Sequence, residues 1–140
     1  MDVPAARRLA RAVAWGRMAI GAAALVAPTL MARPWIGDAA DGTAARLLAR
    51  TMGGRDLALG LGALRALATS DQEARPWVAL GGAADAVDAV ATLLAFSAIP
   101  RRARWGILAV TAGAALVSTR VAESLDSPGP APAAGALGPV

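Results

Sequence analysis

The amino-acid sequence predicts an all-α protein, a transmembrane bundle of four helices that run alternately up and down. Two observations lead to this prediction. Hydrophobic residues make up 56% of the 140 residues and charged residues only 17%, whereas a soluble domain is about 45–50% apolar and about 25% charged. The apolar residues also form four long stretches joined by short polar connections, which favours antiparallel neighbouring helices.

The first predicted helix covers about residues 12–31. Three arginines lie upstream, within residues 1–11, which we interpret as a basic N-terminal segment. The apolar run is too long for the apolar region of a signal peptide and is interrupted by Arg17, so it favours a membrane helix. Arg33 and Pro34 end it, because proline disfavours the helical conformation of the residue before it.

The second predicted helix starts near Asp41 or Thr43, either of which is a plausible N-cap, and runs to about residue 68. It is the poorest candidate for a membrane crossing because of its charged residues. These are Arg46, Arg50, Arg55, Asp56 and Arg65. The helix can still cross the membrane if its polar face points into the bundle and its first turns lie at the membrane surface. A soluble helical bundle is therefore the competing fold class.

The third predicted helix follows Ser70 and continues to about residue 99. Ser70 and Glu73 have the spacing of a capping box, in which the serine hydroxyl accepts a hydrogen bond from the backbone N–H three residues later. After a turn, the fourth predicted helix covers about residues 103–122. The short turns between helices again favour antiparallel packing.

Residues 127–140 form a Pro/Ala/Gly string, SPGPAPAAGALGPV. This segment has no hydrophobic periodicity and too little side-chain bulk to bury, so the sequence predicts a disordered tail. The four-helix membrane domain is therefore expected to cover residues 12–126.

Four tryptophans support this map, because each falls near the end of a predicted helix. If the chain crosses four times, Trp15 and Trp77 lie at one membrane surface, and Trp35 and Trp105 lie at the other. Such aromatic belts are typical of membrane proteins. We expect the lipid bilayer as partner and a multi-pass protein of the cell membrane. The arginines before the first helix favour both termini in the cytoplasm.

Asp85 and Asp88 lie in the middle of the third helix, which is otherwise almost wholly apolar. A carboxylate at the bilayer centre costs roughly 2.5–3.5 kcal/mol, so each needs a counter-charge, water or a proton. Their i, i+3 spacing places both on one helix face. Counting about 1.5 Å per residue places Arg55 at the depth of Asp88, and Arg17 near Asp85. We therefore expect the pairs Arg55–Asp88 and Arg17–Asp85.

Asp56 completes the predicted intramembrane polar site, with Arg50 or a backbone donor as its expected partner. Each helix also has one stripe of small or polar residues, and the simplest arrangement points all four stripes inward. The stripes are Arg17, Gly21, Ala24 and Pro28; Thr51, Arg55, Ala58, Gly62 and Ala66; Gly81, Asp85, Asp88 and Thr92; and Thr111, Ala114 and Ser118.

The composition argues against most enzymatic chemistry. The chain has no cysteine, histidine, lysine or tyrosine, which removes thiol chemistry and most nucleophile–base pairs and makes a zinc site very improbable. The paired carboxylates lack a second cluster for glycoside cleavage or a hard metal ion. The segment Gly53-Gly54-Arg55-Asp56 lacks the strand and lysine of a phosphate loop. We expect no enzyme activity, cofactor, metal or nucleic-acid partner.

Two functional hypotheses remain. The first is a non-enzymatic structural or partner subunit, either a homo-oligomer or bound to another membrane protein, whose buried arginines and aspartates fix helix register. The alternative is a small-solute or proton-handling carrier that uses Asp85 and Asp88, because ionisable groups inside a membrane are functional candidates by default.

Two segments also carry a resemblance. RTMGGRDLALGLG at 50–62 and ARPWVALGGAADAVD at 74–88 resemble a group of small four-helix membrane proteins from high-GC bacteria, with no assigned function. Residues 17–28 are loosely similar to the wider DoxX-like membrane families. The resemblance covers about residues 10–122 and implies a four-helix membrane fold. Some DoxX-like relatives are linked to thiol metabolism, a role that a chain without cysteine does not inherit.

Overall fold

The computed structural model describes residues 1–125, and within them all regular secondary structure is helical. The elements are α1 (Val3–Val26), α2 (Pro28–Ile36), a short 3₁₀ helix η1 (Gly37–Asp41), α3 (Thr43–Thr69), α4 (Asp71–Leu94) and α5 (Arg104–Leu125). This confirms the all-α prediction. The tail predicted at residues 127–140 lies outside the described residues.

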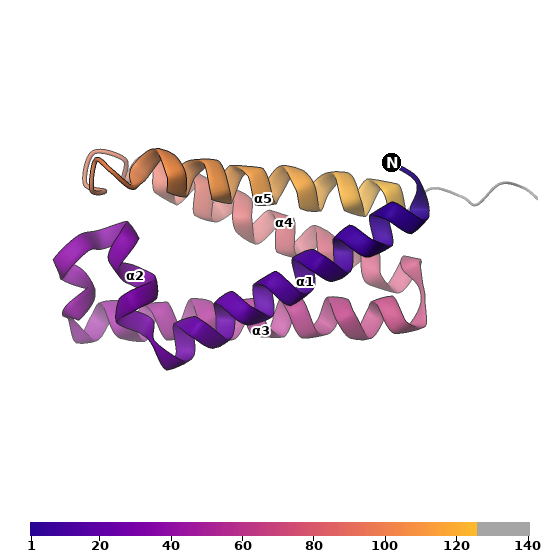
Figure 1. Cartoon of the computed structure of the whole chain (residues 1–140), viewed down its shortest axis with the longest axis horizontal. Helices are drawn as coiled ribbons and strands as arrows, with labels where there is room; N and C mark the ends of the chain where they lie inside the picture. The colour runs from indigo at the N-terminus through magenta and orange to yellow at the C-terminus, as the bar shows by residue number, and fades with distance from the viewer. Residues whose placement is uncertain (126–140) are drawn as a thin grey trace, which may run out of the picture.

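The four long helices run alternately in opposite directions, and α2 with η1 folds back between α1 and α3 (Figure 1). Helix α1 runs obliquely to the others. It begins beside the C-terminal part of α5 and then leans away, so that it packs mainly on α3. The molecule therefore has one end where all four long helices meet and another where α1 and α5 are apart.

We call the first region the closed end. Its core consists of small or medium apolar residues from all four long helices: Ala6, Ala10, Ala66, Leu67, Ala74, Val78, Val121, Ala122 and Leu125. Alanines let helix backbones approach closely, which explains why this end is fully packed. At the edge of this core, the Arg7 guanidinium pairs with Asp71 and donates a hydrogen bond to the carbonyl oxygen of Leu67, 2.9 Å away.

Glycines bring α1 and α3 into backbone contact between the two ends. A Cβ on Gly21 would lie 2.6 Å from the carbonyl oxygen of Gly53, and one on Gly60 would lie 2.7 Å from that of Ala14. Neither gap accepts a methyl group, so the crossing of α1 over α3 depends on these glycines.

The start of the chain differs from the prediction. Helix α1 begins at Val3 rather than near residue 12, because the Asp2 side chain caps it by accepting a hydrogen bond from the N–H of Ala5. The basic segment at residues 1–11 thus forms the first turns of α1, and Trp15 lies near the middle of that helix. The helix also ends early, at Val26, and Pro28 begins the separate helix α2.

The middle of the chain follows the prediction more closely. Helix α3 spans nearly the expected residues, Thr43–Thr69, but its N-cap is Gly42 without a side-chain hydrogen bond, so neither Asp41 nor Thr43 caps it. The Ser70 hydroxyl caps α4 as predicted, by accepting a hydrogen bond from the N–H of Glu73 at 3.1 Å. Helix α4 ends at Leu94, several residues earlier than predicted. The turn that follows is held by Phe96, whose ring meets that of Trp105 edge-on and lies 5.0 Å from the guanidinium carbon of Arg104.

Within residues 1–125, three helices are long and apolar enough to cross a membrane: α1, α4 and α5. By length and composition the described residues thus form three candidate crossings rather than the four predicted, and α3 is the helix that does not qualify. Its length suffices, but Arg55 and Asp56 lie at its centre between Arg50 and Arg65. If α3 crosses a membrane, its central charges must be paired inside the protein.

Candidate functional site: an internal arginine–aspartate network

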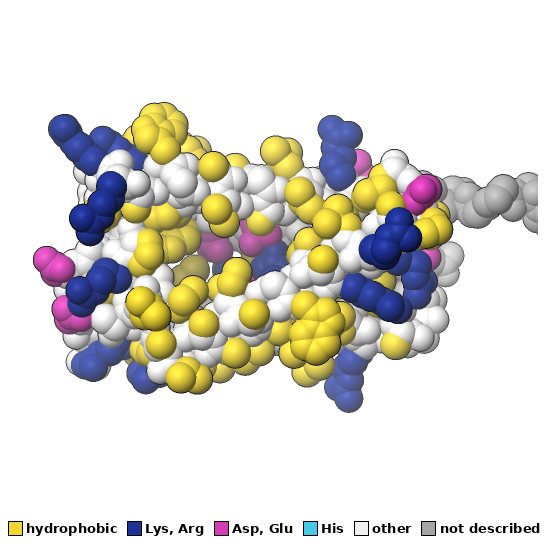
Figure 2. All heavy atoms as spheres, viewed as in Figure 1, with side chains coloured by type: hydrophobic (Ala, Val, Ile, Leu, Met, Phe, Trp, Pro, Cys, Tyr) yellow, Lys and Arg dark blue, Asp and Glu magenta, His cyan; other side chains and the backbone are white. Residues whose placement is uncertain are grey.

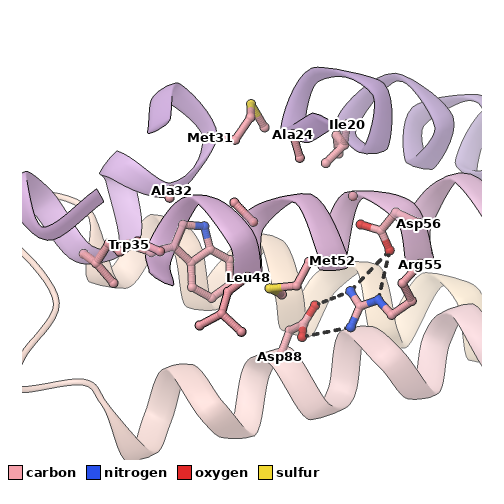
Figure 3. Close-up of a pocket in the computed structure, with 14 residues that line it drawn as sticks. Ile20, Ala24, Met31, Ala32, Trp35, Leu48, Met52, Arg55, Asp56 and Asp88 are labelled. Atoms are coloured by element: carbon pink, nitrogen blue, oxygen red, sulfur yellow. Dashed lines mark hydrogen bonds and ion pairs between the residues drawn. The ribbon is translucent and has the colours of Figure 1, made fainter. Parts of the chain in front are cut away.

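The structure brings all five predicted site residues together. Arg17 comes from α1, Arg55 and Asp56 from α3, and Asp85 and Asp88 from α4. The Arg55 guanidinium faces both carboxylate oxygens of Asp88, with N···O distances of 2.8 and 3.3 Å (Figure 3). This two-point contact is the strongest geometry that an arginine and a carboxylate can adopt.

Arg17 joins the network from the opposite side. Its Nη2 donates to the Asp85 carboxylate and to the carbonyl oxygen of Gly81, which is 2.6 Å away. The absence of a side chain at Gly81 makes room, since a Cβ there would lie 2.9 Å from Nε of Arg17. The arginine thus spans from α1 to α4, although these two helices make few direct contacts.

Asp56 has a different partner from the one expected. Its Oδ1 accepts hydrogen bonds from Nη1 of Arg17 at 3.2 Å and from Nε and Nη2 of Arg55 at 3.3 and 3.2 Å. Arg50 instead donates to the carbonyl oxygen of Leu25. Six residues separate Arg50 from Asp56, and at 3.6 residues per turn they lie on different faces of α3. Asp56 therefore links the two arginines into one network.

The network holds more carboxylates than arginines. Three aspartates face two guanidinium groups, which leaves one formal negative charge in excess. Hydrogen bonds from residues 1–125 reach both oxygens of Asp88 but only one oxygen each of Asp56 and Asp85. The arginine donors are thus largely engaged, while two carboxylate oxygens keep free acceptor positions.

A hollow of about 290 Å³ opens above part of this network. Arg55, Asp56 and Asp88 form its floor. Its walls are apolar and come from α1, α2 and α3: Ile20, Ala24, Met31, Trp35, Leu48 and Met52. Figure 2 shows acidic and basic side chains at the bottom of a depression whose rim is apolar, and Figure 3 shows the wall residues above the Arg55–Asp88 pair.

Sequence reasoning found the floor of the hollow but missed its walls. The sequence predicts residues 28–36 as partly the end of the first membrane helix and partly a connection, whereas they form α2, which brings Met31 and Trp35 over the network. The available signal was Pro28. Proline favours the first turn of a helix, so the pair Ala27-Pro28 marks a new helix as readily as a kink.

Within residues 1–125, exposed charged residues lie toward the two ends of the molecule. The central segment of each long helix has none: 12–26 in α1, 51–64 in α3, 76–94 in α4 and 105–119 in α5. The charged residues within these segments are the network itself, and all of its members are buried or half-buried. Large apolar side chains such as Leu61, Val87 and Val110 cover the outside of this central zone.

No family model, curated protein or solved structure matches this chain. The resemblance to DoxX-like families therefore stays a prediction, and the site is interpreted from its own geometry. Within residues 1–125 no group of three or more acidic, histidine or cysteine residues is arranged to hold a metal ion.

Proposed function

We propose that this chain is a four-crossing integral membrane protein and a non-enzymatic structural or partner subunit, in which the arginine–aspartate network fixes the packing of α1, α3 and α4. The observation that carries the proposal is the separation of its charges. Exposed charges gather toward the two ends, and central charges are paired across three helices. A membrane requires this arrangement, whereas water does not.

The charge separation supports α3 as the fourth crossing. Its central charges make it too polar by composition, yet Arg55 and Asp56 face inward and are ion-paired. At 1.5 Å per residue, the segment without exposed charges is about 21 Å long in α3, at 51–64, and about 22 Å long in α5, at 105–119. Both are shorter than a hydrocarbon core of about 30 Å. Arginines at their ends make up the difference by extending toward the headgroups.

Single-cysteine labelling tests the number of crossings, because the natural chain has no cysteine. Ala39→Cys and Ser97→Cys place a thiol in the connections after α1 and α4, and Gln72→Cys places one in the first turn of α4, next to the connection after α3. A membrane-impermeant maleimide is then applied to intact cells. We expect Ala39→Cys and Ser97→Cys to react from one side and Gln72→Cys from the other. With both termini in the cytoplasm, Ala39→Cys and Ser97→Cys react from outside the cell.

The control is Val87→Cys, on the exposed apolar face of α4, which the reagent should reach from neither side. If α3 does not cross, Ala39→Cys and Gln72→Cys react from the same side, and the four-crossing proposal fails. Rapid labelling of Val87→Cys by the impermeant reagent would exclude a membrane-embedded α4.

The excess carboxylate and the hollow favour a second candidate, a small-solute or proton-handling carrier that uses Asp85 and Asp88. A network with three carboxylates and two arginines is balanced by a proton or by a bound cation. In proteoliposomes with a trapped pH dye, a carrier of this kind moves protons or a cationic solute, and Asp85→Asn or Asp88→Asn slows this movement. Equal rates in wild type and both variants would exclude this candidate.

A further inference from the structure

We propose that the hollow binds a small lipophilic ammonium ion, a protonated amine with an apolar body, through the carboxylate of Asp56. This inference rests on the carrier candidate above and names its ligand class. Three features of the hollow argue for it: the sign of the charge at its floor, the type of hydrogen-bonding group left free there, and the apolar walls.

The charge at the floor favours a cation. The network carries one formal negative charge in excess, so an anion would add to an existing imbalance, whereas a monocation cancels it. Two of the three aspartates, Asp56 and Asp88, line the hollow, while Asp85 does not. The excess charge is therefore accessible to an occupant of this space.

The free hydrogen-bonding groups favour an occupant with N–H donors. Arg55 is the only cation that lines the hollow among the described residues, and it already donates to Asp56 and Asp88. Asp56, in contrast, keeps a free acceptor, because its Oδ2 accepts no hydrogen bond from residues 1–125. Figure 3 draws contacts from one of its oxygens only. An ammonium N–H fits that oxygen, and a carboxylate or phosphate does not.

The walls favour an apolar body attached to the ammonium group. Ile20, Leu48 and Met52 provide aliphatic surface, and Trp35 adds an aromatic ring that also attracts cations. The volume of about 290 Å³ is near the lower limit of small-molecule sites, which span about 300–1,000 Å³. A short alkylamine matches both the polarity and the size, and a bare metal ion would leave the walls uncovered.

The test uses full-length protein in phosphatidylcholine nanodiscs, with hexylammonium as the probe and hexanol and hexanoate as matched neutral and anionic probes. Binding is measured as saturable quenching of tryptophan fluorescence and as a rise in the unfolding temperature. We expect hexylammonium to saturate the wild type and the other two probes not to do so. Trp35→Phe should remove most of the quenching but keep the thermal shift.

Variants separate the role of the charge from that of the cavity. Asp56→Asn should weaken hexylammonium binding at least tenfold. Asp71→Asn, which removes a paired carboxylate outside the hollow, should leave it unchanged. Ala49→Phe fills the hollow from α3 and should block binding with every charge in place. If Ala49→Phe does not fold, Leu48→Phe serves the same purpose from the adjacent wall position.

Three results would overturn the inference. One is equal stabilisation by all three probes, which indicates an unselective apolar space. Another is unchanged hexylammonium binding in Asp56→Asn. The third is a wild type that responds to acidification but not to hexylammonium, which shows that a proton balances the carboxylate. None of these results changes the transport rates measured in proteoliposomes or the cysteine-labelling pattern, so failure of the ligand proposal is distinguishable from failure of the carrier candidate and of the membrane topology.

Discussion

The closed end is fully packed, whereas the opposite end, which we call the hollow end because it contains the hollow, is not. Residues of α1, α3, α4 and α5 form the core of the closed end, and residues of α1, α2, α3 and α4 line the hollow. At the closed end Ala6, Ala10 and Ala74 are almost completely buried, and α1 touches α5. At the hollow end Arg17 and Arg55 lie between helices, and α1 leans away. Alanines bring helices together, whereas paired arginines keep them apart at the length of a side chain.

The two ends are also stabilised by different interactions. Packing at the closed end depends on volume, because small side chains fill the space with no polar groups to satisfy. Packing at the hollow end depends on charge, because removing one ionic partner leaves another buried without compensation. Variants that change volume and variants that change charge should therefore affect the two ends differently.

The largest expected effect concerns charge at the hollow end. Asp88→Asn removes the two-point partner of Arg55, and Arg55→Gln removes the partner of Asp88. Breaking a buried pair typically costs 3–5 kcal/mol, and we expect about 3–4 kcal/mol for each single variant. The double variant should partly recover, with a coupling of about 1–3 kcal/mol in denaturant unfolding in micelles.

The matched control is the pair Arg7–Asp71 at the edge of the closed end, whose side chains are 36% and 24% exposed, against 31% and 14% for Arg55 and Asp88. The two pairs are similarly buried in the protein, but Arg7–Asp71 lies at an end of the molecule, where water screens it. A cycle of Arg7→Gln and Asp71→Asn should therefore give a coupling below about 1 kcal/mol. Strictly additive losses for Arg55 and Asp88 would show that the network does not set the helix packing, and the structural role proposed for it would be wrong.

The next largest effect concerns volume at the closed end. Ala74 is 0% exposed there, so Ala74→Leu adds three carbons where no space exists, and we expect a loss of about 2–3 kcal/mol in unfolding free energy. Ala49 lines the hollow, and Ala49→Leu should change stability by less than about 0.5 kcal/mol because its side chain enters open space. Similar losses at both positions would contradict the contrast between the two ends.

Much of this contrast could be predicted from the sequence. The depth count along the helices placed Arg55 beside Asp88 and Arg17 beside Asp85, and the structure contains both pairs. The stripes on α1 and α4 do face inward: Arg17, Gly21 and Ala24 are buried, and Gly81, Asp85, Asp88 and Thr92 are buried or half-buried. Strong periodic signals on single helices were therefore reliable.

The stripe on α3 was only partly right, because two partners compete for that helix. Ala66 is buried and Arg55 and Gly62 are half-buried, but Thr51 and Ala58 are exposed. Gly53 and Gly60 are instead buried against the backbone of α1. Gly62 meets a different neighbour, since the Trp77 ring of α4 occupies the space that a Cβ would take. A helix of small residues has several faces that suit close packing, and its own sequence does not say which neighbour takes which face.

A third effect tests the crossing that separates the two ends. A Cβ on Gly53 would lie 2.7 Å from the carbonyl oxygen of Gly21 and 2.9 Å from Cβ of Ala24. Gly53→Ala should therefore push α1 from α3 and cost about 2 kcal/mol. Gly54→Ala is the adjacent control. It meets no atom within 4 Å and should stabilise the helix by about 0.5–1 kcal/mol. Equal effects of the two substitutions on the unfolding temperature would show that α1 and α3 are not in backbone contact.

The smallest effect compares how helices begin at the two ends. At the closed end the Ser70 hydroxyl accepts a hydrogen bond from the N–H of Glu73, so Ser70→Ala should cost about 1 kcal/mol. At the hollow end α3 begins after Gly42, which offers no side chain for a cap but has the extended backbone, φ −70° and ψ 148°, that a capping serine adopts. A Cβ at this position would lie 3.3 Å from the carbonyl oxygen of Ala39, so that oxygen must shift slightly. Gly42→Ser should therefore gain at most a few tenths of a kcal/mol.

Thermal unfolding of Ser70→Ala, Gly42→Ser and the combined variant measures both effects, which should add because the two sites lie on opposite ends of α3. A loss well above 1 kcal/mol for Ser70→Ala would mean that the hydroxyl supports the closed end beyond its cap. Such a loss would have a structural cause, because Ser70 follows Leu67 and precedes Ala74 in the chain, and both of these residues belong to the closed-end core. The carbonyl oxygen of Leu67 also accepts a hydrogen bond from Arg7. No loss at all would show that water replaces the cap freely.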